Sequence, residues 1–127
     1  MLTRALVIGL VLAAACAPHN AGTAAPSTRT RNTLLAEEIK GVSVSTAYDA
    51  VIRLRPSWLR NRGPISVQQP NAGQVVAYVD GLRVGGADAL ARVPASAVVQ
   101  IEYLSGPDAT TRFGMGHDGG AILVRTH

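Results

Sequence analysis

The sequence has a single cysteine, few charged residues and no long apolar run. With one Cys among 127 residues, no internal disulfide can form, so a disulfide-stapled mini-protein is excluded. The chain is also too short for a closed transmembrane barrel or a two-domain enzyme. Charged residues make up 16% of the chain and hydrophobic residues 47%, which argues against disorder and predicts one folded domain.

The longest apolar run lies near the N-terminus. Arg4 precedes residues 5–15, which are apolar apart from Gly9, and small residues lead into Cys16. The run is too short for a resident membrane-spanning helix and is typical of a secretory signal. We therefore expect residues 1–15 to be a signal peptide. Because an exported chain rarely meets nucleic acid, we expect no nucleic-acid ligand.

The lone cysteine needs an explanation in an exported chain, because it has no partner there. Cys16 follows Leu12 and three alanines, an arrangement that resembles the lipobox of bacterial lipoproteins, although that family prefers Leu one position nearer the Cys. The resemblance implies that Cys16 carries acyl chains such as palmitate and, with the non-acidic Ala17 after it, that the protein is sorted to the outer membrane. Each buried CH₂ would contribute about 0.8 kcal/mol to membrane binding. The alternative is an ordinary secretory signal that is cleaved near Ala15 or Ala17.

The next segment lacks large apolar residues. Residues 17–31 are mostly Ala, Pro, Thr, Ser, Gly and Asn with two arginines, a composition that cannot bury enough surface to order itself. We expect residues 16–32 to form a lipidated N-terminus and flexible tether. Residues 33–127 are then the folded domain.

Two helices are expected at the start of that domain. The first covers residues 34–40, with Asn32 or Thr33 as its cap and Gly41 as its end. The second begins at Thr46, which has capping-box spacing to Asp49. Its apolar stripe is Ala47, Ala50, Val51, Leu54 and Trp58, and Pro56 should end the regular helix near Arg55.

A basic rim and a loop follow. The arginines at positions 53, 55, 60 and 62 are expected to be solvated, and a partner-binding patch is the alternative. Residues 61–74 are rich in Gly, Pro, Asn and Gln and predict a loop, with a short strand at 65–67.

The second half of the chain predicts strands that alternate with short helices. Residues 75–79 form an apolar, mostly buried strand, and Asp80-Gly81 predicts a hairpin turn into a return strand at 82–84. Gly85-Gly86 should break the chain before a helical turn at 87–91. Further elements are a strand at 98–104 with Val99, Ile101 and Tyr103 on its buried face, a helix that starts at Ser105-Gly106-Pro107-Asp108 and stops at Gly114, and a strand at 121–125. The fold class is α+β, a small mixed sheet with short helices.

Four segments of this half, taken in order, form a pattern that can be compared with known families. They are Tyr78-Val79-Asp80-Gly81, then residues 101–109 (IEYLSGPDA), residues 112–114 (RFG) and residues 119–126 (GGAILVRT). In order and spacing they resemble the plug domain of TonB-dependent outer-membrane receptors, which typically shows a VDG turn, an IE-x-L-x-GP-x-A junction, an aromatic-Gly pair and a closing GG-x-I-x-I-x-T strand. The resemblance implies a plug-like fold in which the motif residues shape the backbone. These residues are Asp80, Gly81, Gly106, Pro107, Gly114, Gly119 and Gly120.

In this interpretation the glycines allow backbone conformations that other residues rarely adopt. Gly81 permits positive φ in the turn, Gly106 before Pro107 lets a strand bend into a helix, and Gly114 closes that helix. Gly119-Gly120 lets the backbone swing into the last strand. Because the sequence ends one residue after that strand and contains no convincing TonB-coupling box, we expect a stand-alone, barrel-less domain.

No residue set predicts catalysis, a metal site or a cofactor. His19 falls in the tether and His127 at the chain end, while His117-Asp118 is expected on an exposed glycine-rich loop without a third ligand. Ser105 lacks a nucleophile-elbow context, and the loop lacks the Lys-Ser/Thr of a P-loop. We therefore expect a protein that is not an enzyme.

The sequence thus predicts a lipid-anchored cell-envelope protein that faces the periplasm. Its role would be a binding or accessory module for an outer-membrane barrel or another envelope protein. The alternatives are a structural or vestigial plug-fold protein, and a periplasmic domain that recognises peptidoglycan or a small ligand. Docking is expected at an exposed sheet edge, at Val84, Ile122 and Val124.

Overall fold

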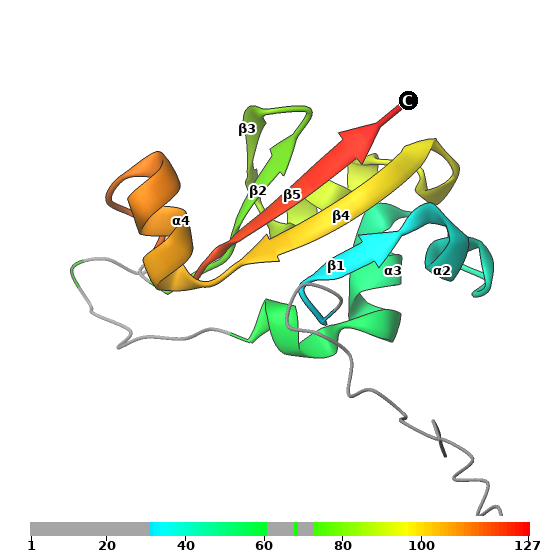
Figure 1. The fold of residues 1–127 in the computed structure, drawn as a ribbon, viewed down its shortest axis with the longest axis horizontal. Coiled ribbons are helices and arrows are strands. Elements are labelled where there is room, and N and C mark those ends of the chain that lie inside the picture. The colour runs from blue at the N-terminus through cyan, green and yellow to red at the C-terminus, as the bar shows by residue number, and fades with distance from the viewer. Residues whose placement is uncertain (1–30, 61–67, 69–72) are drawn as a thin grey trace, which may run out of the picture.

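The computed structural model describes residues 31–60, 68 and 73–127 (Figure 1). The expected signal peptide, Cys16, His19 and the tether up to residue 30 lie outside the described residues, as do Arg62 and the strand expected at 65–67. Within the described residues, no helix has both the length and the apolar character needed to cross a membrane. The elements in chain order are β1 (Thr33–Leu35), α2 (Ala36–Lys40), α3 (Ala47–Leu54), η1 (Pro56–Leu59), β2 (Val76–Val79), β3 (Leu82–Gly86), η2 (Ala87–Arg92), η3 (Ala95–Ala97), β4 (Val98–Leu104), α4 (Gly106–Phe113) and β5 (Ala121–Thr126).

The strands form a mixed sheet in the order β1-β4-β5-β2-β3. The pairing of β2 with β5 is parallel, and the other three pairings are antiparallel. With the short helices packed on it, this sheet confirms the predicted α+β class. In Figure 1 the long strands β4 and β5 cross the middle of the molecule, and α4 lies at one end of the sheet.

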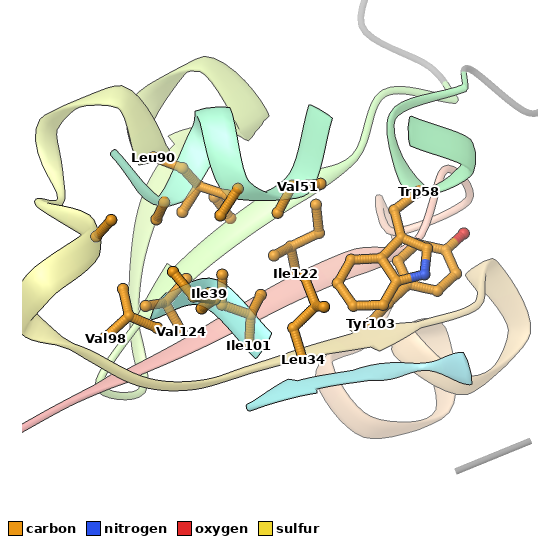
Figure 2. Close-up of a cluster of buried hydrophobic side chains, with 14 of the residues drawn as sticks. Leu34, Ile39, Val51, Trp58, Leu90, Val98, Ile101, Tyr103, Ile122 and Val124 are labelled. Carbon is orange, nitrogen blue, oxygen red and sulfur yellow. The ribbon is translucent and has the colours of Figure 1, made fainter. Parts of the chain in front are cut away.

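The two sides of the sheet are covered differently. We call the side that packs against α3 the inner face and the opposite side the outer face. The inner face carries the main core, where Leu34, Ile101 and Ile122 pack beneath Val51 and Leu90 (Figure 2). The outer face carries a second and smaller cluster, in which Ala109 of α4 packs on the sheet. Because side chains alternate along a strand, one sheet supplies both clusters.

The helix α3 forms as its sequence predicts. Thr46 Oγ1 accepts a hydrogen bond from the Asp49 backbone N–H at 3.1 Å, and Asp49 Oδ2 accepts one from the Thr46 backbone N–H at 3.2 Å, which confirms the capping box. Regular helix ends at Leu54, before Pro56. Trp58 follows in η1 and stacks on Tyr103 with ring centroids 5.6 Å apart (Figure 2).

The helix expected over residues 34–40 is wrong in its first two residues, which are strand. Leu34 pairs opposite Ile101 of β4 and is fully buried, so tertiary pairing overrides the local helical pattern. The helix then starts at Ala36, because Glu38 Oε2 accepts the hydrogen bond of the Leu35 backbone N–H at 3.2 Å. Gly41 follows the helix, as predicted.

Two register irregularities correct the strand predictions. The pairing of β4 with β5 shifts between Val98 and Gln100, so Val98 is buried in the core and Val99 is only half-buried. Gly85 and Gly86 do not break the chain as expected. They belong to β3, whose pairing with β2 shifts around Val84.

The expected docking edge is wrong for two of its three residues. The strand β5 lies between β4 and β2, and its residues Ile122 and Val124 are buried. The edge strands of this sheet are β1 and β3, so only Val84 lies at an edge.

Candidate functional site on the outer sheet face

The register places outer-face side chains in rows across the sheet. The first row, Val76, Ala121 and Leu104, lies under α4. A second row, in order across the sheet, consists of Arg83, Tyr78, Leu123, Glu102 and Thr33. A third row contains Arg125, Gln100 and Leu35. Since α4 packs on the first row and part of the second, the rest of the outer face is open.

An aromatic cluster joins α4 to the sheet. The ring of Phe113 stacks on that of Tyr78 with centroids 4.4 Å apart, and His117 lies beside both. The guanidinium of Arg112 lies over the Phe113 ring, 5.3 Å from its centroid. This contact holds the Arg112 side chain toward the open part of the face.

His117 is buried, which corrects the expectation of an exposed loop residue. It is 3% exposed, and Gly114 O accepts a hydrogen bond from its Nδ1 at 2.8 Å. Because a carbonyl oxygen can only accept, Nδ1 carries the proton, and Nε2 accepts from the Tyr78 hydroxyl at 2.8 Å. Both ring nitrogens are therefore engaged in holding the loop. Among the described residues, no three His, Cys, Asp or Glu side chains are grouped so that they could bind a metal.

Asp80 ties the hairpin turn to the end of β5. Its Oδ1 accepts from the Thr126 backbone N–H at 2.8 Å, and its Oδ2 accepts from the Thr126 hydroxyl at 2.5 Å. These two hydrogen bonds, that of the hydroxyl first, lower the pKa of Asp80. Burial opposes them, and the nearby charge of Arg125 lowers the pKa further. Asp80 and Gly81 both have positive φ, 48° and 85°, as a tight hairpin turn requires.

At two of the remaining motif residues, another segment of the backbone approaches closely. A Cβ on Gly106 would collide with the carbonyl oxygen of Asp118, and one on Gly119 with the carbonyl oxygens of Gly73 and Gln74. Close approach of chain segments, more than freedom to turn, therefore requires glycine at these two positions. Gly114 ends α4 and Gly120 precedes β5, both with positive φ, while Pro107 occupies the first turn of α4.

A cleft of about 180 Å³ lies on the open part of the outer face. Its apolar floor includes Leu123, and one rim is the turn at Asp80 and Gly81. Besides Asp80, the polar side chains that line it are Gln100, Glu102, Arg112 and Arg125, which come from β4, α4 and β5. Sequence analysis did not predict this site, although the outward positions of Gln100 and Glu102 on their strand could be read from the alternation of β4.

The other predicted positions are not brought together. Arg55 is not a free rim residue, since its Nη2 lies 3.2 Å from Glu38 Oε1 and its Nε donates to the Arg31 carbonyl oxygen. Arg53 and Arg60 are exposed, as expected. His127 lies at the end of β5, where its backbone N–H donates to Ala97 O.

Comparison with known proteins identifies the fold. No protein-family model matches the sequence, and no curated protein matches it. Among solved structures, the siderophore receptor PirA from Acinetobacter baumannii matches with a TM-score of 0.55 and 22% identity, over 75% of this chain and 17% of the receptor chain. PirA from Pseudomonas aeruginosa matches over the same shares with 25% identity and a TM-score of 0.49.

The fold is that of a receptor plug domain. The Acinetobacter baumannii receptor carries this conclusion, and it confirms the plug-like fold that the four segments predict. The chain spans 17% of the length of that receptor, so the likeness concerns the architecture of one part of it.

Proposed function

We propose that this plug-like domain is a non-enzymatic binding module of the cell envelope, which docks with an outer-membrane transport protein or another envelope protein. The observation that supports this role is the fold, which is similar to part of an outer-membrane siderophore receptor. Acylation of Cys16 would anchor the domain to the outer membrane, and the following residues would let it reach a partner.

The edge strand β3 is the docking surface that we propose. Its residues Leu82 and Val84 are 73% and 41% exposed, and β3 is paired on one side only, with β2. An exposed edge offers backbone groups to an added strand, while side-chain pockets provide selectivity. The register shift at Val84 twists this edge, which would restrict pairing to a partner strand of matching shape.

The experiment is a cross-linked pull-down from native envelopes with the intact protein as bait. We expect an outer-membrane protein to be recovered with the wild type and lost with Cys16→Ser, because the unanchored domain leaves the membrane surface. Recovery of no specific protein would favour the alternative of a plug fold without a transport partner.

A second pair of variants tests the edge itself. Val84→Lys places a charge in the docking strand and should abolish recovery. Ile52→Lys is the matched control, because Ile52 is similarly exposed, at 45%, but lies on α3. Equal recovery with both variants would contradict the proposed edge.

A further inference from the structure

The cleft on the outer face holds charges of both signs that do not neutralise one another by direct contact. Ion pairs between described residues join Lys40 with Glu37 and Arg55 with Glu38, both away from the cleft. Glu102, Arg112 and Arg125 line the cleft without an ion pair between them. Asp80, the second acidic residue of the lining, lies near the charge of Arg125, but its carboxylate is taken up by hydrogen bonds from Thr126. A ligand with two opposite charges would therefore find a complement for each of them.

A ring contact holds one of these groups, and the register of the sheet places the other two. Arg112 lies over the Phe113 ring, which is held in turn by Tyr78 and His117. Glu102 and Arg125 stand on neighbouring strands. Their positions are diagonal in the register, because Glu102 pairs opposite Leu123 and Arg125 opposite Gln100.

The spacing suits a very short peptide. Diagonal neighbours on adjacent antiparallel strands are about 7–8 Å apart, and two extended residues span roughly 7 Å. The cleft of about 180 Å³ is smaller than the roughly 300–1,000 Å³ of pockets for drug-sized ligands, which also limits the ligand to this size.

We propose that this cleft binds a zwitterionic dipeptide-sized ligand with a free ammonium and a free carboxylate. The ammonium pairs with Glu102, the carboxylate with Arg125 or Arg112, and the apolar part lies on Leu123. Gln100 offers an amide that can donate to or accept from the peptide group. The proposal is independent of partner docking, which we assign to β3.

The test is an NMR titration of the full chain in detergent with three probes. They are the dipeptide Ala-Ala, its N-acetyl form, which lacks the ammonium, and its amide, which lacks the carboxylate. We expect Ala-Ala to shift the amide resonances of Gly81, Gln100 and Leu123 with a dissociation constant near 1 mM, since exposed ion pairs contribute little each. Each blocked form should bind about fivefold more weakly. Equal affinity for all three probes, or no shift at these residues, would overturn the proposal.

Variants identify the side chains that bind the ammonium and the carboxylate of the ligand. Glu102→Gln should abolish the discrimination between Ala-Ala and N-acetyl-Ala-Ala. The double variant Arg112→Gln, Arg125→Gln should abolish that between Ala-Ala and its amide. Arg92→Gln is the control, because Arg92 is also exposed but lies in η2, away from the cleft. If the control weakens binding as much as the site variants do, the cleft is not the binding site.

These results are separate from those of the pull-down. Val84→Lys should leave the titration unchanged, and Glu102→Gln should leave partner recovery unchanged. Failure of one proposal is therefore distinguishable from failure of the other.

Discussion

The inner and outer faces of the same sheet differ in how they are covered and packed. The inner face is covered by α3 and η2 and is packed with aliphatic side chains around Ile122 and Leu90. The outer face is covered by α4 at one end only, and its cluster includes Tyr78, hydrogen-bonded to the buried His117. We infer that the inner face supplies most of the stability, whereas the open part of the outer face and the edge strand β3 are available for binding.

The largest effect should come from a cavity on the inner face. Ile122→Ala removes a fully buried side chain from the main core. We expect the free energy of unfolding to fall by about 2–5 kcal/mol, measured by urea denaturation. A loss below about 1 kcal/mol, as expected for exposed positions, would contradict the assignment of the core.

A pair of tyrosines compares the two faces with one chemical change. On the outer face, Tyr78→Phe leaves His117 Nε2 buried without its donor, and should lower the free energy of unfolding by about 1–3 kcal/mol. On the inner face, the hydroxyl of Tyr103 is buried and has no hydrogen-bond partner among the described residues. Tyr103→Phe should therefore leave stability unchanged or raise it by up to about 1 kcal/mol. Thermal unfolding of both variants checks this, and equal losses would show that the hydroxyls are equivalent.

The contribution of Asp80 to stability should depend on pH, which distinguishes the hairpin turn from the rest of the outer face. Hydrogen bonds from Thr126 lower the folded-state pKa of Asp80, so its carboxylate stabilises the fold above the unfolded pKa, which is about 3.9. This contribution is lost as the pH falls through the lowered pKa. The stability difference between wild type and Asp80→Asn should thus shrink below about pH 4, as measured by urea midpoints. A difference that stays constant down to the acid limit would mean that the carboxylate charge does not matter.

The smallest effect should come from the open part of the outer face. Leu35 is 51% exposed in the third row. Leu35→Ala should change the free energy of unfolding by no more than about 0.5 kcal/mol. A larger loss in chemical denaturation would indicate that this part of the face is covered in the isolated protein.

Prediction from sequence succeeded where local patterns decide the structure. The capping box at Thr46 and the turn at Asp80-Gly81 depend on residues a few positions apart, and both are confirmed. The buried state of His117 depends on Tyr78, which is 39 positions away, and a loop residue has no periodicity that would indicate burial.

The order of the strands in the sheet was the other feature that the sequence did not predict. The apolar run Ala121-Ile122-Leu123-Val124 is typical of a strand buried on both faces, and β5 does lie inside the sheet. Its place beside β2 is set by pairing between segments more than 40 residues apart, which no local pattern encodes. The cleft was missed for the same reason, since it combines side chains of β4, α4 and β5.

The central claim is that the edge strand β3 docks an envelope partner. Its most direct test is site-specific photo-cross-linking in native envelopes. A photoreactive residue at position 84 should give a discrete adduct with an outer-membrane protein, and the same residue at position 52 should give none. Adducts of equal yield at both positions, or no adduct at position 84, would contradict the account.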